Sequence, residues 1–184
     1  MKQLIIGGAR SGKSSLAERL ALNANKSVVY IATANAELND TEMANRIHHH
    51  QQRRPKHWAC VETTIGLAKQ IQIADSPETC ILVDCLTLWL SNCLLDSNRQ
   101  LWPEQKQALI DTLATTKADI IFVGNEVGLG IVPIGEANRR FIDENGFLHQ
   151  SVASLCDRVI MTAAGLPLVF KGQPLADNID SETR

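Results

Sequence analysis

The hydrophobic pattern of the chain predicts an α/β protein in which strands and helices alternate. Apolar runs rich in β-branched residues predict strands over 4–6, 27–33, 80–85 and 118–124, and shorter strands over 58–62, 158–162 and 168–170. Helical spacing of apolar residues predicts helices from residue 13 to a break at 23–26, and over 40–54, 65–74, 86–95, 104–117 and 134–157. We therefore expect a mostly parallel central sheet flanked by helices.

Local signals refine the second half of this pattern. Pro103 is placed to be the first residue of its helix, and Gly146 marks a candidate interruption of the long helix that follows. The last two strands are joined by Ala-Ala-Gly-Leu-Pro and predict a C-terminal antiparallel hairpin. The polar tail from Gly172 is expected to be mobile.

Length and composition indicate one ordinary globular domain spanning residues 1–184. A net charge of −2 does not indicate binding to nucleic acid or to an anionic membrane surface. There is no apolar run long enough to span a membrane, and Lys2 is followed at once by the first strand, so we expect neither a membrane span nor a signal peptide. Five cysteines without a C-x-x-C pair favour reduced thiols and a cytoplasmic protein.

A phosphate-binding motif follows the first predicted strand. It reads G-x-x-x-x-G-K-S and consists of Gly7, Gly8, Ala9, Arg10, Ser11, Gly12, Lys13 and Ser14. Its glycines let backbone N–H groups surround phosphate oxygens, and the helix that opens at Lys13 directs its positive dipole end at the same anion. Lys13 is expected to bridge the β- and γ-phosphates, and the Ser14 hydroxyl to bind Mg²⁺. The chain is therefore predicted to bind a nucleoside triphosphate.

Other strand ends add candidates at the carboxyl edge of the sheet, where ligands of such folds bind. Asp84 ends an apolar strand and is expected to help hold Mg²⁺. Ala32, Thr33 and Ala34 end another strand, and the glycine-rich turn over 125–130 follows a third. A T-K-x-D sequence at 116–119 resembles a guanine-reading motif, but it precedes a strand instead of following one, so we interpret it as chance.

The predicted helix over 40–54 carries a candidate nucleophile. His49 lies one turn from Arg46 and from Arg53 on a shared face with Glu42. Those two cations favour a neutral imidazole and would also hold a polyphosphate, which suits a histidine that attacks phosphorus. Spacing alone leaves open an ordinary solvated helix with three adjacent histidines.

The motifs together resemble the bifunctional adenosylcobinamide kinase / adenosylcobinamide-phosphate guanylyltransferase family of cobalamin biosynthesis. The matching pieces, in the expected order, are GGARSGKS (7–14), YIAT (30–33), EMANRIHHH (42–50), RPKHW (54–58) and NEVGLGIVP (125–133). The resemblance implies a RecA-like P-loop fold and a homotrimer. It also implies phosphorylation of adenosylcobinamide with ATP or GTP as donor, then transfer of GMP from GTP to adenosylcobinamide phosphate.

The resemblance also implies roles for individual residues. Alignment of the R-I-x-H-H pattern places a covalently guanylylated histidine at His49, and Mg²⁺ is the expected metal. The residues expected around the nucleotide are His50, Gln51, Gln52, Arg53, Glu62, Asp84 and the edge formed by Ala32, Thr33 and Ala34. Asp84 stands where some relatives are expected to have glutamate, and either carboxylate can serve Mg²⁺ or a ribose.

Two other functions fit the residues less well. A single-activity P-loop kinase of another small alcohol would form no covalent nucleotide adduct. A non-enzymatic nucleotide-binding module would turn GTP over slowly and ignore corrinoids. The chemical side chains expected at the sheet edge argue against the second alternative.

Overall fold

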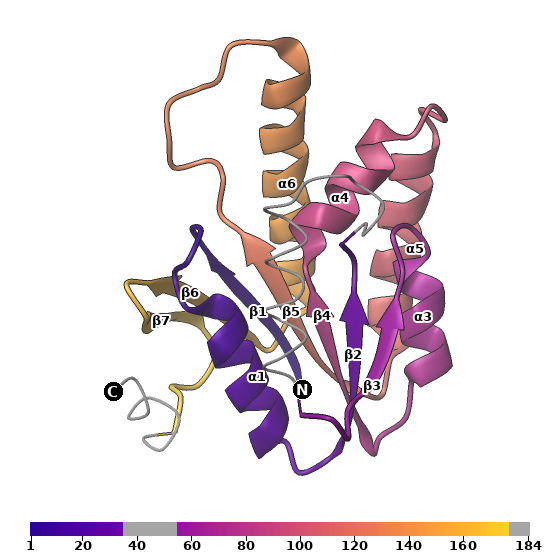
Figure 1. The fold of residues 1–184 in the computed structure, drawn as a ribbon, viewed down its shortest axis with the longest axis vertical. Coiled ribbons are helices and arrows are strands. Elements are labelled where there is room, and N and C mark those ends of the chain that lie inside the picture. The colour runs from indigo at the N-terminus through magenta and orange to yellow at the C-terminus, as the bar shows by residue number, and fades with distance from the viewer. Residues whose placement is uncertain (35–54, 177–184) are drawn as a thin grey trace.

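The computed structural model of this chain describes residues 1–34 and 55–176, which build a seven-stranded sheet. The strands are β1 (Lys2–Gly7), β2 (Ser27–Ala32), β3 (Ala59–Glu62), β4 (Thr79–Asp84), β5 (Asp119–Asn125), β6 (Arg158–Ala163) and β7 (Leu166–Lys171). Their order across the sheet is β3-β2-β4-β5-β1-β6-β7 (Figure 1). All neighbours are parallel except β6 and β7, which form an antiparallel hairpin. The predicted fold class is confirmed.

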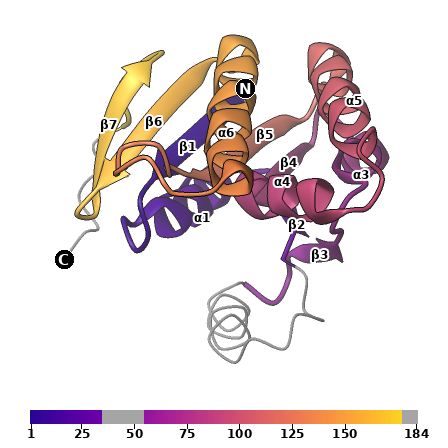
Figure 2. The ribbon, with the colours of Figure 1, turned by 90° about the horizontal axis from the view of Figure 1, so that it is seen from above.

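Helices cover both faces of this sheet. They are α1 (Lys13–Asn23), α3 (Leu67–Ala74), α4 (Leu86–Leu95), α5 (Leu101–Thr115) and α6 (Glu136–Leu155). Side chains of α3, α4, α5 and α6 share one buried cluster with one face of the sheet, and α1 packs on the other face (Figure 2). The central strands are buried on both faces, which explains their nearly continuous apolar runs.

Within residues 1–34 and 55–176, the predicted element boundaries hold within a few residues, with two corrections. The helix predicted over 40–54 lies outside the described residues. Helix α5 begins at Leu101, so Pro103 is its third residue and not its first. Proline is tolerated there because the first-turn N–H groups have no intrahelical acceptor. Helix α6 passes through Gly146 without interruption, but it begins at Glu136, so Ile134 belongs to the preceding loop.

The start of the C-terminal tail also differs from the expectation of a purely polar segment. Leu175 is buried and belongs to the cluster on the α1 face of the sheet. Burial of this side chain gives residues 172–176 an apolar attachment point beyond β7.

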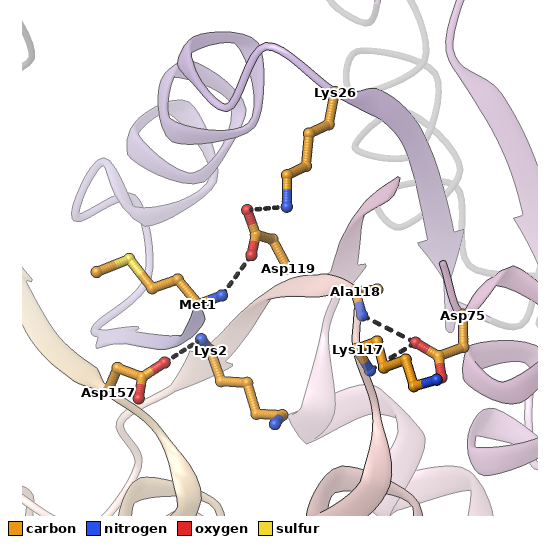
Figure 3. Close-up of polar contacts among 8 residues, drawn as sticks. All are labelled: Met1, Lys2, Lys26, Asp75, Lys117, Ala118, Asp119 and Asp157. Carbon is orange, nitrogen blue, oxygen red and sulfur yellow. Dashed lines mark hydrogen bonds and ion pairs between the residues drawn. The ribbon is translucent and has the colours of Figure 1, made fainter. Parts of the chain in front are cut away.

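Carboxylates organise the amino edge of the sheet (Figure 3). Asp75 accepts hydrogen bonds from the backbone N–H groups of Lys117 and Ala118, each at 2.8 Å. Asp119, the first residue of β5, pairs with the ammonium of Lys26 at 2.9 Å and with the amino group of Met1. The T-K-x-D sequence thus lies at the edge opposite the phosphate-binding turn, in agreement with its interpretation as chance.

Candidate nucleotide site

The phosphate-binding turn connects β1 to α1 at the carboxyl edge of the sheet. Gly12 precedes the helix with φ of 97°, a left-handed conformation that favours glycine. A Cβ atom at Gly12 would lie 3.1 Å from Cα of Gly165, at the tip of the β6–β7 hairpin. The N–H of Gly165 donates to the carbonyl of Ser11 at 3.0 Å. The hairpin tip is therefore packed directly against the turn.

A second contact joins the turn to β6. The hydroxyls of Ser11 and Thr162 share a hydrogen bond of 2.8 Å, and both side chains are buried. A Cβ atom on Gly7 would lie 2.5 Å from each of these hydroxyl oxygens, so no larger residue fits without displacement. The glycine at the end of β1 is thus required by close packing beneath the turn.

Lys13 lies across its own turn. Its Nζ donates to the carbonyl oxygen of Gly8 at 2.9 Å. Burial lowers the pKa of Lys13 from its ordinary value, and the neighbouring Cys85 and Asp84 partly oppose that shift. Because its ammonium is half-buried and close to the turn, it is well placed to gain from the negative charge of phosphate oxygens.

Asp84 ends β4, which is separated from β1 only by β5. The hydroxyl of Tyr30 on the adjacent strand β2 donates to Asp84 Oδ2 at 2.9 Å. Ala32 pairs with Asp84 on one side and with Glu62 on the other. The structure therefore brings Glu62, Ala32 and Asp84 into one row at the carboxyl edge, as expected from the sequence.

Thr33 contributes to this row as a structural connector. It is fully buried, and its hydroxyl donates to the carbonyl of Cys85 at 2.7 Å and accepts from the N–H of Cys85 at 2.8 Å. Its own carbonyl accepts a hydrogen bond from the Asn92 side chain at 2.9 Å. These bonds fasten the end of β2 to the start of α4. A direct contact of Thr33 or of the half-buried Ala34 with nucleotide stays a prediction.

A buried polar network lies behind the site, and no sequence motif indicated it. The N–H of Asn125, at the end of β5, donates to the Thr87 hydroxyl at 2.7 Å, and its carbonyl accepts from the Asn145 amide at 3.1 Å. Thr87 also donates to Asn145 at 3.3 Å, and the Asn145 amide lies 3.5 Å from Nδ1 of His149. Helices α4 and α6 thus hold the strand end beside the turn. The glycine-rich sequence after Asn125 indicated only that the turn is functional.

The remaining predicted site residues are His49, His50, Gln51, Gln52 and Arg53, and all five lie outside the described residues. Across 1–34 and 55–176, no group of three or more His, Cys, Asp or Glu side chains is arranged to hold a metal ion. Mg²⁺ does not need such a group, since it is commonly bound by one or two carboxylates together with substrate phosphates. In the same ranges, no helix is long and apolar enough to cross a membrane.

Comparison with known proteins identifies the family. Residues 3–170 match the family described as cobinamide kinase / cobinamide phosphate guanyltransferase. The chain belongs to this family. It is 50% identical over 175 residues to the bifunctional adenosylcobalamin biosynthesis protein CobP of Pseudomonas aeruginosa, covering 95% of this chain and 100% of that protein. It is 35% identical over 184 residues to the corresponding protein CobU of Escherichia coli, covering 93% of this chain and 100% of that protein.

Solved structures confirm the fold at lower sequence identity. A RadB recombinase matches with a TM-score of 0.55 and 13% identity, covering 94% of this chain and 81% of the recombinase. A Pyrococcus horikoshii protein matches with a TM-score of 0.54 and 11% identity, covering 97% and 88%. These likenesses establish the RecA-like P-loop fold. The family establishes the two activities, cobinamide kinase and cobinamide-phosphate guanylyltransferase.

Proposed function

We propose that this chain performs both family reactions at one nucleotide site, first phosphorylating adenosylcobinamide and then attaching GMP to the new phosphate. The observation that carries this proposal is the complete phosphate-binding turn with Asp84 in the same sheet edge, in a chain that matches bifunctional relatives over their whole length. GTP serves the second reaction, and ATP or GTP the first. A cytoplasmic location follows from the use of these nucleotides.

In the kinase reaction, the protein positions the nucleotide and neutralises its charge. Backbone N–H groups of the turn and the Lys13 ammonium bind the phosphate oxygens, and the adenosylcobinamide hydroxyl displaces the terminal phosphoryl group. The Ser14 hydroxyl and the Asp84 carboxylate are hard oxygen donors of the kind that Mg²⁺ prefers, and bound Mg²⁺ would neutralise the phosphate charge. Lys13 exchanges its bond to Gly8 for bonds to the phosphates in this step.

In the guanylyl transfer, His49 is the proposed nucleophile. A neutral imidazole nitrogen attacks the α-phosphorus of GTP, so that a P–N bond forms and pyrophosphate leaves with the electrons of the broken P–O bond. A phosphate oxygen of adenosylcobinamide phosphate then attacks the same phosphorus, the P–N bond breaks, and adenosylcobinamide-GDP is released. The support for this step is the R-I-x-H-H pattern and the two arginines that lie three residues before and four residues after His49 in the sequence.

The covalent step predicts a labelled protein. Wild-type protein incubated with Mg²⁺ and GTP labelled at the α-phosphate is expected to retain label after denaturation, with the label lost in acid and stable in alkali. The His49→Ala variant should retain none while keeping most of its kinase activity. Retention of label in that variant would mean that another residue is the nucleophile, with His50 as the first candidate. Absence of any adduct in the wild type would instead favour a single-activity kinase.

We also propose a homotrimer, as the family resemblance implies. Supporting this, the edge strand β7 exposes the alternate side chains Leu166, Leu168 and Phe170 on one face. A second copy covering this face would bury three large apolar side chains. Sedimentation equilibrium tests the proposal, and a monomeric mass at micromolar concentration would contradict it.

A further inference from the structure

The loop between β5 and α6 exposes an unusual group of large apolar side chains. Four of them are largely in solvent: Leu129 is 78% exposed, Ile131 97%, Val132 74% and Ile134 96%. We call residues 129–134 the apolar loop. Single exposed apolar residues are ordinary, but a contiguous group marks a surface that binds something.

The chain enters the apolar loop from residues that lie against the nucleotide site. The N–H of Glu126 donates to the carbonyl of Gly7, the first residue of the phosphate-binding turn, at 3.0 Å. Asn125 is held by Thr87 and Asn145, as described above. Figure 1 shows the loop rising beyond the carboxyl edge of the sheet, and Figure 2 shows it beside α6, on the side of β6.

The far end of the apolar loop is tied down as well. The side chain of Asn138 donates to the carbonyl of Ile134 at 3.2 Å, and Arg139 donates to the carbonyl of Pro133 at 3.5 Å. These bonds attach the backbone of the loop to the first turn of α6. The loop is thus anchored at both ends, while its apolar side chains stay in solvent. Anchoring of this kind reduces the ordering cost when a ligand binds.

The chemistry of the two substrates decides what covers this surface. A nucleoside triphosphate presents mainly charged phosphates to the turn, and charged phosphates gain no favourable contact from four aliphatic side chains. The acceptor is a corrinoid, a large macrocycle with methyl groups on both faces and amides at its edge, and its hydroxyl must reach the phosphate held by the turn. Part of the acceptor therefore has to lie on the solvent side of the turn, where the apolar loop projects.

We propose that the apolar loop is the binding surface for the corrin ring of the cobinamide substrate. Ile131 and Ile134 pack against a methyl-bearing face of the ring, and the side arm with the reacting hydroxyl extends from it toward Gly7 and Lys13. The inference rests on the proposed function in taking adenosylcobinamide as the acceptor. It adds a specificity surface to the nucleotide site, separate from the apolar face of β7.

The double variant Ile131→Ser/Ile134→Ser tests this assignment. Both side chains are almost fully exposed, so the free energy of unfolding should hardly change, whereas each isoleucine removed from the corrin-binding surface should weaken adenosylcobinamide binding by about tenfold. The dissociation constant for adenosylcobinamide is measured by isothermal titration with GTP bound in the absence of Mg²⁺, so that no phosphoryl transfer accompanies binding. It is expected to rise by about a hundredfold. The affinity for GTP should stay within about twofold of the wild type.

The matched control is Ile73→Ser, because Ile73 is 70% exposed near the end of α3, which leads to the amino edge of the sheet. It should bind both substrates like the wild type. Unchanged adenosylcobinamide affinity in the double variant would overturn the inference. A fall in sedimenting mass of the double variant, absent from Ile73→Ser, would also overturn it by assigning the loop to a second copy.

The GTP adduct separates failure of this inference from failure of the proposed function. Formation of the labelled adduct needs no corrinoid, so the double variant should form it to the wild-type extent. No adduct in either protein would contradict the guanylyl-transfer mechanism. A normal adduct together with unchanged corrinoid affinity in the double variant would contradict the apolar-loop assignment alone.

Discussion

At the residue scale, Tyr30 holds one oxygen of the Asp84 carboxylate. Tyr30 is 2% exposed, and its hydroxyl donates to Asp84 Oδ2 at 2.9 Å from the neighbouring strand. The buried ring cannot move without disturbing the core, so this bond limits rotation of the carboxylate. In the proposed site, a fixed carboxylate favours Mg²⁺ binding because the side chain loses less conformational entropy when the metal binds.

Tyr30→Phe removes this hydroxyl and leaves the ring packing intact. Loss of a hydrogen bond to a charged group corresponds to about 1–2 kcal/mol, so the Mg²⁺ concentration for half-maximal kinase activity should rise roughly fivefold to thirtyfold. Mn²⁺ affinity of the GTP complex, followed by electron paramagnetic resonance, should fall in parallel. GTP affinity measured without metal should not change. An unaltered metal requirement would mean that other contacts orient Asp84.

At the scale of elements, two helices hold the end of β5. Asn145 of α6 is 2% exposed and bonds both the Asn125 carbonyl and the Thr87 hydroxyl of α4. Asn145→Leu leaves these groups buried without their partner, so the free energy of unfolding should fall by about 2–3 kcal/mol. Urea denaturation followed by circular dichroism measures the change. Gln150→Leu, at an exposed position of the same helix, is the control and should cost less than about 0.5 kcal/mol.

The Thr87→Val/Asn145→Leu pair tests whether the network acts as a unit. Both side chains bond the same strand residue. The second substitution should therefore lower the free energy of unfolding by less than it does alone. If the loss of unfolding free energy in the double variant equals the sum of the two single losses, the two helices hold β5 independently.

Elements were predictable from the sequence where local and tertiary signals agree. Helix α4 has the predicted bounds, and the buried strands differ by one or two residues. The phosphate-binding turn was predictable because its chemistry requires specific residues in consecutive positions. The role of Asn145 was not predictable, because a buried asparagine and a surface asparagine look the same in a helical sequence pattern. Only the folded chain shows which groups Asn145 bonds. Ile134 was wrongly assigned to a helix because an exposed apolar residue in a loop gives the same sequence signal as a core residue.

At the scale of the whole molecule, the two edges of the sheet have different roles. The carboxyl edge carries the turn, Asp84 and the start of the apolar loop, whereas the amino edge is fastened by carboxylates (Figure 3). Lys26 precedes β2 and Asp119 opens β5, so their ion pair spans the intervening strand β4. Stability of the amino edge is thus electrostatic and should depend on pH.

The pKa of Asp119 gives the sign of that dependence. Burial raises this pKa, but hydrogen bonds and charges from Lys26 and the Met1 amino group outweigh burial and bring the pKa below its ordinary value of 3.8. A carboxyl with a lower pKa in the folded state stabilises the protein above its unfolded pKa of about 4, and the contribution is lost as the pH falls through the folded pKa.

Asp119→Asn should therefore lower the free energy of unfolding at pH 7 by about 1 kcal/mol, since the pair is only partly exposed. The difference from the wild type should narrow below about pH 4, where the wild-type carboxylate takes up a proton. Urea denaturation at pH values from 7 to 3 measures both quantities. Asp157→Asn is the control, because asparagine can still accept the Lys2 N–H bond that Asp157 accepts at 2.7 Å. A difference between Asp119→Asn and the wild type that stays constant with pH would mean that Asp119 acts through packing and not through charge.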